Sequence, residues 1–158
     1  DFENLDIMPA NIDLSAAEVQ LVTEVGREQV LAGVLRQVKD EYDVIIVDCQ
    51  PSLGLLTVNA LTAADGVIIP VVAEFFALRG VALLMQSIEK VQSRINPSLE
   101  VYGVLVTMFT HTLHCDEVLQ RIYEAFQGKV FHSVISRSIK TSGFHGCGRA
   151  YHHLCAEP

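Results

Sequence analysis

Three apolar runs recur along the chain, and each is long enough to form a buried strand. They are residues 44–47 (VIIV), 67–72 (VIIPVV) and 101–106 (VYGVLV). None alternates strictly between apolar and polar residues, and that pattern is typical of parallel strands covered on both faces. We therefore expect these three runs to be strands of one parallel sheet.

Helical periodicity occupies the stretches between the runs. A capping-box pattern at residues 15–18 predicts a helix that continues to about Val38. The side of this helix that we expect to be buried carries four valines, namely Val19, Val22, Val30 and Val34. Residues 78–95 and 115–126 are also helical in pattern. Strands that alternate with helices predict an α/β fold, a parallel sheet flanked by helices.

Composition narrows the class of protein. The chain has 158 residues, of which 50% are hydrophobic, and this favours one domain with a sizeable core. Its apolar runs are far shorter than the roughly 20 residues of a membrane-spanning helix. Because the formal net charge is -8, broad electrostatic attraction to nucleic acid is disfavoured. Four irregularly spaced cysteines predict no disulfide framework, which favours the cytoplasm: Cys49, Cys115, Cys147 and Cys155.

Residues 42–61 (YDVIIVDCQPSLGLLTVNAL) contain the main candidate site. The expected strand 44–47 ends on Asp48, and ligands of open α/β sheets bind outside the carboxyl ends of strands. Asp48 is therefore a candidate metal ligand, and the alternative is an aspartate that only caps the following turn. The glycine-rich phosphate loop G-x-x-x-x-G-K-[ST] occurs nowhere in the chain. The sequence thus holds half of a nucleotide site.

The segment VDCQPSLGLLTVNALTAADGVIIPVVAEFFALRGVALL resembles the ParA (Soj) branch of the ParA/MinD family of deviant Walker ATPases. The resemblance extends from LDIMPANIDLSAAEVQLV to KVFHSVISRSIK, about 85–90% of the chain, far more than a short motif covers. It implies a P-loop NTPase-like fold that is incomplete here, because the phosphate-loop strand and helix are missing. The chain also begins at Asp1 without an initiator methionine, so we interpret it as an N-terminally truncated fragment.

The resemblance also implies roles for individual residues. Asp48 would be the Walker B aspartate that holds Mg²⁺ through water, and Pro51 and Gly54 would belong to the second switch. Thr107 and Met108 would line the adenine pocket. Residues 74–80 would lie near the dimer face, although their aromatic side chains also fit a core. The implied cofactors are ATP and Mg²⁺, and no catalytic residue is assigned.

Family members partition bacterial chromosomes and plasmids. The resemblance implies an ATP-dependent homodimer that binds DNA nonspecifically and a ParB-like partner that stimulates ATP hydrolysis in a cytoplasmic, nucleoid-associated protein. His111 and Asp116 stand where relatives commonly carry arginine, so we expect weakened DNA binding. The C-terminal residues show no amphipathic helix pattern, so we expect no association with a membrane. Without the phosphate loop we expect an inactive chain, and the alternative is a non-catalytic remnant or interaction module.

Residues 141–158 differ from the rest and show no apolar periodicity. Their metal-ligand types follow no standard zinc spacing: His145, Cys147, His152, His153 and Cys155. Back-translation read one base later can give PDSTVAAEPITTYAPN, which resembles the C-terminal segment of ParA proteins. We interpret the tail as the product of a frameshift near Lys140. The expected organisation is an ATPase-like part at 1–140 and an aberrant, disordered tail at 141–158.

Overall fold

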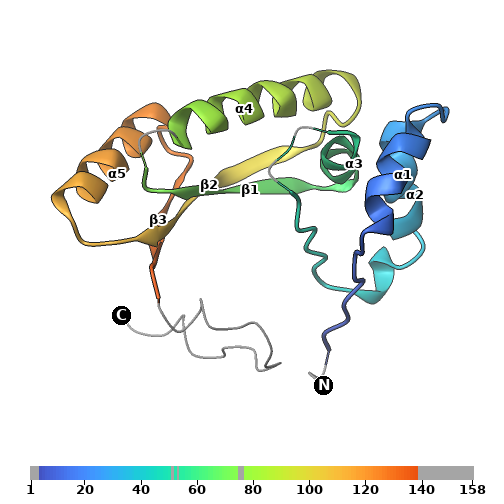
Figure 1. The fold of residues 1–158 in the computed structure, drawn as a ribbon, viewed down its shortest axis with the longest axis horizontal. Coiled ribbons are helices and arrows are strands. Elements are labelled where there is room, and N and C mark those ends of the chain that lie inside the picture. Colours follow the sequence, from blue (N-terminus) through green and yellow to red (C-terminus); the bar gives the residue numbers. More distant parts are fainter. Residues whose placement is uncertain (1–3, 51, 53, 75–76, 139–158) are drawn as a thin grey trace.

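A computed structural model describes residues 4–50, 52, 54–74 and 77–138 of the chain. Its sheet has three parallel strands in the order β1 (Gly66–Val72), β2 (Glu100–Phe109) and β3 (Val130–Ser136). The strands predicted at 67–72 and 101–106 are confirmed as β1 and β2, whereas β3 was not predicted. The parallel sheet flanked by helices is also confirmed (Figure 1).

Helices α4 (Ala77–Arg94) and α5 (Leu113–Ala125) connect the strands and cover one face of the sheet (Figure 1). The hydrophobic core lies beneath them, and its most completely buried side chains are Ile88, Ile122, Val104 and Val106. On the other face Ile68, Tyr102 and Ile135 are each more than half exposed. Among the described residues, the expectation of a sheet covered on both faces therefore holds for one face only.

The N-terminal part of the chain forms several short helices rather than the single one predicted from Ser15 to Val38. The structure has α1 (Asp13–Leu21), α2 (Val30–Leu35) and the one-turn 3₁₀ helices η1 (Arg27–Gln29) and η2 (Lys39–Glu41). The break follows from Gly26, whose φ of 71° is left-handed and cannot continue a right-handed helix. Helix α1 begins at Asp13, whose backbone N–H donates to the Asn11 side chain at 2.8 Å.

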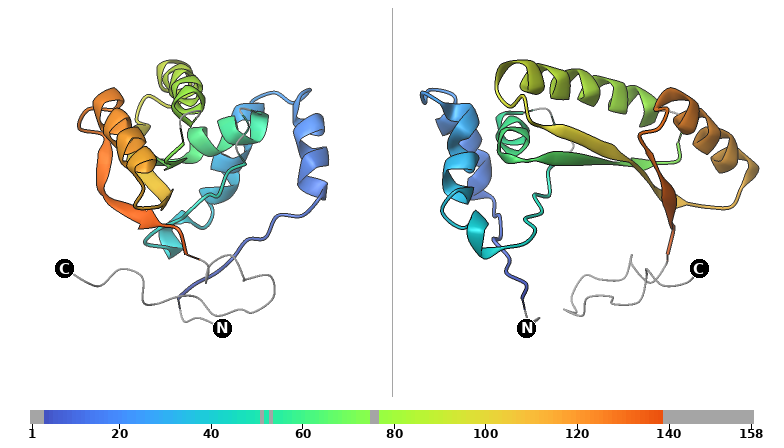
Figure 2. Two further views of the ribbon diagram at one scale, coloured as in Figure 1. Left: turned by 60° about the vertical axis from the view of Figure 1, so that its left-hand side comes forward. Right: turned by 180° about the vertical axis from the view of Figure 1, so that it is seen from behind.

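The four valines predicted to be buried along that helix are exposed. Val19 and Val22 show 73% and 55% of their surface, and Val30 and Val34 show 43% and 46%. An apolar helix face is buried only where another element packs on it. Helix α1 has little contact with the sheet, so its valines stay exposed. Figure 2 shows α1 and α2 beside α3 (Leu55–Ala63), at the end of the sheet where β1 begins.

The prediction of a strand at residues 44–47 is wrong. These residues have no regular secondary structure, and Val44 and Ile46 are 73% and 87% exposed. A parallel strand needs a neighbouring strand for its backbone hydrogen bonds. No described residue pairs with this run, so it remains an exposed apolar coil between η2 and α3 (Figure 1).

None of the helices in the described ranges is both long enough and apolar enough to cross a lipid bilayer.

Candidate functional site

Asp48 lies in the exposed coil rather than at the end of a strand. In Figures 1 and 2 this coil runs from η2 to α3 on the side where β1 begins, whereas Thr107 and Met108 lie near the end of β2. The structure therefore does not bring Asp48 together with the two predicted adenine-pocket residues. Pro51 lies outside the described residues.

Cys49 follows Asp48 in the same coil. Its thiol is partly desolvated, which raises the pKa of the Cys49 side chain, and the negative charge of Asp48 raises this pKa further. Both influences favour the neutral thiol. Cys49 is thus a weak candidate for a thiolate metal ligand beside Asp48.

Gly54 precedes the first turn of α3, and the half-buried Glu18 of α1 lies against it. The backbone N–H of Leu55 donates to Glu18 Oε1 at 3.0 Å, so this carboxylate satisfies one of the free donors at the start of the helix. A β-carbon at Gly54 would overlap Glu18 Oε1. A side chain at position 54 would therefore displace this carboxylate from the start of α3, and the sequence patterns did not indicate Glu18 for this role.

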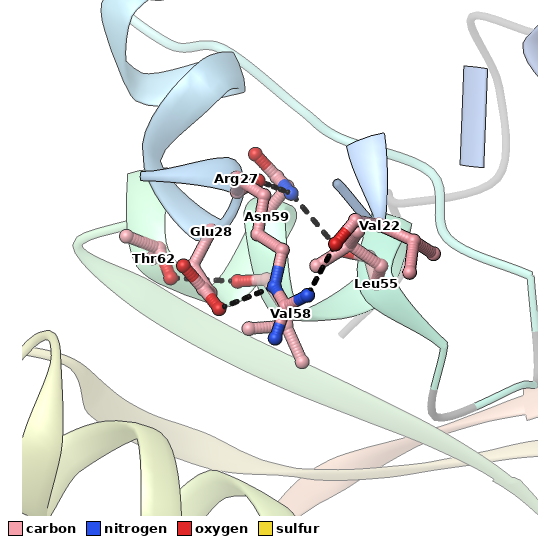
Figure 3. A network of polar contacts seen from close by, with 7 residues as sticks. All are labelled: Val22, Arg27, Glu28, Leu55, Val58, Asn59 and Thr62. Carbon is pink, nitrogen blue, oxygen red and sulfur yellow. Dashed lines mark hydrogen bonds and ion pairs between the residues drawn. The ribbon is translucent and has the colours of Figure 1, made fainter. Parts of the chain in front are cut away.

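Asn59 holds α3 to the N-terminal helices (Figure 3). The buried Asn59 amide donates to the carbonyls of Arg27 at 2.7 Å and Leu55 at 3.0 Å, and its oxygen accepts from Leu31 N–H at 3.1 Å. At the other end of α3, Asn96 donates to the carbonyls of Leu61, Thr62 and Ala64. These amides satisfy backbone groups that burial would otherwise leave unpaired. They fix α3, and with it the end of the Asp48 coil.

Thr107 and Met108 form an irregularity near the carboxyl end of β2. The register with β3 shifts between Val106 and Phe109, and Met108 has a φ of 52°. A left-handed conformation is uncommon for a residue other than glycine and costs about 1–3 kcal/mol. Met108 is 59% exposed, so it does not fill the core.

Cys115 was not predicted as a site residue, yet it lies where β1 and β2 end. Its sulfur is 3.2 Å from the Thr110 hydroxyl and 3.9 Å from the Ala73 carbonyl. Its backbone N–H donates to the side chain of Thr112, the N-cap of α5. Hydrogen bonding from Thr110, and next from Thr112, lowers the pKa of the Cys115 thiol. The two threonines are neighbours of Cys115 in sequence, whereas the contact with Ala73 joins residues 42 positions apart and gives no local sequence signal.

In the part of the chain that the structure describes, no group of three or more His, Cys, Asp and Glu side chains is arranged to hold a metal ion. The possible zinc ligands of the tail, like the proposed frameshift, lie outside the described residues. So do Phe75 and Phe76, the aromatic residues of the predicted dimer-face segment.

Comparisons with known proteins give a consistent assignment. The model of the AAA domain family AAA_31 matches residues 1–101. An uncharacterized protein of Mycobacterium tuberculosis is 54% identical over 87% of this chain and 44% of its own length. The chromosome-partitioning ATPase Soj of Treponema pallidum is 47% identical over 88% of this chain and 55% of its own length. The chain thus spans about half the length of these curated relatives.

A solved structure shows the same fold. It is the cobyrinic acid a,c-diamide synthase of Mycobacterium smegmatis with bound ADP and magnesium, which is 41% identical to the chain with a TM-score of 0.78. The likeness covers 82% of this chain and 54% of that one. With a family model matched over more than half of its residues, the chain belongs to the AAA_31 domain family, and its Soj and ParA homologues assign it to the ParA (Soj) family with a P-loop NTPase-like fold.

Proposed function

We propose that this chain carries the magnesium-binding part of a ParA-type partitioning ATPase and lacks the residues to hydrolyse ATP alone. The observation that supports this most is the 47% identity to Soj over 140 residues. A match of that length within 158 residues necessarily includes Asp48, Gly54, Thr107 and Met108. We also propose that the ATPase-like part of the chain is formed by residues 1–140.

The residues present fit the metal better than they fit the phosphates. Asp48 is an exposed carboxylate, and Mg²⁺ commonly takes one or two protein carboxylates together with water and phosphate oxygens. Asp48 would hold the ion through water, and Thr107 with Met108 would contact the adenine. Bound Mg²⁺ would neutralise charge on the phosphates. No residue of this chain supplies the lysine and backbone amides of a phosphate loop, so we derive no catalytic step.

The finer family properties are part of this proposal. They are dimerisation on ATP, stimulation by a ParB-like partner, nonspecific DNA binding and a cytoplasmic location. Asp116 carries a negative charge where relatives carry a cation, and His111 packs edge-on against Phe109 with ring centroids 5.2 Å apart. Both features disfavour phosphate contacts, so DNA binding by this chain is expected to be weak.

The first test measures phosphate release from Mg·ATP by the isolated chain. We expect no release above the background without protein, because no phosphate loop holds the β- and γ-phosphates. Robust release that disappears in the Asp48→Ala variant would contradict this expectation.

The second test joins the N-terminal part of the Treponema pallidum Soj, as the source of a phosphate loop, ahead of Asp1. We expect this fusion to hydrolyse ATP and Asp48→Ala to slow it about 100-fold or more. The matched control is Asp43→Ala, which removes another exposed carboxylate of the same coil and should leave the rate unchanged. A fusion that folds by circular dichroism but never hydrolyses ATP would favour the alternative of a non-catalytic remnant.

A further inference from the structure

A cleft of about 520 Å³ lies between α3, α4 and η1, away from the carboxyl ends of the strands. Its apolar lining comes from Val22, Leu55, Val58, Val91 and Ile95. Two exposed cations of α4, Lys90 and Arg94, also line it. The lining of the cleft thus combines apolar side chains with positive charge.

The two cations of α4 are available for a ligand. Lys90 and Arg94 are exposed and lie one helical turn apart, on the same side of α4. Neither forms an ion pair or a side-chain hydrogen bond with any described residue. Glu89, in the adjoining hollow, is the nearest acid of this helix in sequence and forms no salt bridge with either cation. Two cations on one rigid helix therefore face the cleft without a partner in the described structure.

A third cation is held in place on the opposite wall. Arg27 of η1 donates from Nε to Glu28 Oε1 at 3.0 Å and from Nη1 to the carbonyl of Val22 (Figure 3). These bonds fix the Arg27 side chain, which lines the same cleft as Val58. Glu28 offsets one of the three positive charges, so the cleft keeps an excess of positive charge in a chain whose net charge is -8.

Two kinds of anion could bind in such a cleft: a nucleic-acid backbone or an acidic protein segment. Phosphate contacts to DNA depend on charge and do not require an apolar lining. An acidic segment that carries an apolar side chain uses both properties, because carboxylates meet the cations of the cleft and the apolar group is removed from water. We propose that this cleft is a docking site for an acidic, leucine-bearing segment of a partner protein.

The occupant would contact the start of α3. Gly54 and Leu55 also line the cleft, and Leu55 is the residue whose N–H is bound by Glu18. A docked segment therefore lies directly behind the Asp48 coil, at the end that α3 fixes. Docking of the segment does not require nucleotide, so the result of the docking test is independent of whether the chain hydrolyses ATP.

The test titrates the full chain into a fluorescein-labelled synthetic peptide of alternating leucine and glutamate and follows anisotropy. We expect binding that weakens with added salt and that falls about tenfold in the Lys90→Glu/Arg94→Glu variant, because two attractive contacts become repulsive. Lys129→Glu is the matched control, an exposed cation outside the cleft, and should bind as the wild type does. Circular dichroism confirms that each variant is folded.

Two results would overturn the proposal. One is equal peptide binding by the wild type and the double variant. The other is preferential binding of duplex DNA that the double variant loses, which would assign the cleft to nucleic acid. A peptide with glutamine in place of glutamate separates the two contributions, and the proposal requires it to bind more weakly than the acidic peptide.

Discussion

At the scale of single residues, contacts between distant parts of the chain define the surroundings of Gly54 and Asn59, whereas neighbours in sequence set those of Cys115. Glu18 approaches Gly54 so closely that a side chain there would displace it, and the Asn59 amide is fully used by Arg27, Leu31 and Leu55. Cys115 gains its altered acidity from Thr110 and Thr112. Each of these residues would look unremarkable within its own segment of sequence.

The two described cysteines should titrate in opposite directions. The pKa of Cys115 is lowered and that of Cys49 is raised, so alkylation of Cys115 by iodoacetamide should reach half its maximal rate at a lower pH. The pKa of Cys115 is lower in the folded chain than in the unfolded chain, so the ionised thiolate stabilises the folded state. This contribution to stability is fully present above the pKa of the unfolded thiol, and it is lost as the pH falls through the pKa of the folded thiol.

Mass spectrometry of the two cysteine peptides over a pH series measures these rates. Thr110→Val removes the hydroxyl that contributes most, and it should move the Cys115 midpoint to higher pH without moving that of Cys49. Coincident midpoints for the two thiols in the wild type would contradict the assignment.

At the scale of elements, helices are held either by apolar packing on the sheet or by polar side chains at their ends. Helix α4 belongs to the first kind, because Val81, Ile88 and Val91 are buried along one side of it. Helix α3 also has a buried side, yet Glu18 and Asn96 occupy its two ends. The apolar period of α4 is visible in sequence, whereas the end contacts of α3 are not.

Truncation of Ile88 should therefore destabilise the fold strongly. Its side chain is fully buried between α4 and the sheet, so Ile88→Ala should lower the free energy of unfolding by about 2–5 kcal/mol. Leu83→Ala is the matched control, because Leu83 lies on the same helix with 53% of its surface exposed, and a change within about 0.5 kcal/mol is expected. Urea unfolding followed by circular dichroism gives both values. Equal losses of unfolding free energy in the two variants would contradict the assignment of Ile88 to the face of α4 that packs on the sheet.

At the scale of the whole molecule, the described residues leave much apolar surface in contact with water. The run 44–47 is exposed, and so are Ile68, Tyr102 and Ile135 on the open face of the sheet. The outer edge of β1 has no strand beside it, because the described sheet begins with β1. Exposed apolar residues next to a free strand edge favour association between chains.

The isolated chain should consequently self-associate, and Ile46→Lys should reduce this. Ile46 is 87% exposed within a run of four apolar residues, and a charge there interrupts the run. Val25 is fully exposed but has no apolar run around it, so Val25→Lys serves as the control and should have little effect. Light scattering over a concentration series measures association. A wild-type chain that is monomeric and unfolds cooperatively would contradict the prediction that the exposed apolar surface drives association.

Much of the fold followed from local pattern. The apolar runs at 67–72 and 101–106 became β1 and β2, and the periodic stretches at 78–95 and 115–126 became α4 and α5 within a few residues. Short-range periodicity suffices for these elements because each packs on its immediate neighbour in the chain. Strand β3 escaped prediction because its sequence, VFHSVIS, mixes polar and apolar positions in a half-exposed strand.

By itself the sequence determined the parallel α/β architecture and the family, because apolar period and the segment around Asp48 are local properties. Only the tertiary structure decided that residues 44–47 lie exposed, that Gly26 lies in a left-handed turn between the N-terminal helices, and that the coil carrying Asp48 runs on the side of the sheet where β1 begins (Figure 1). An apolar run becomes a strand when another strand satisfies its hydrogen bonds and covers its side chains. Whether such a neighbour is present depends on the whole assembly of elements, which no local pattern records.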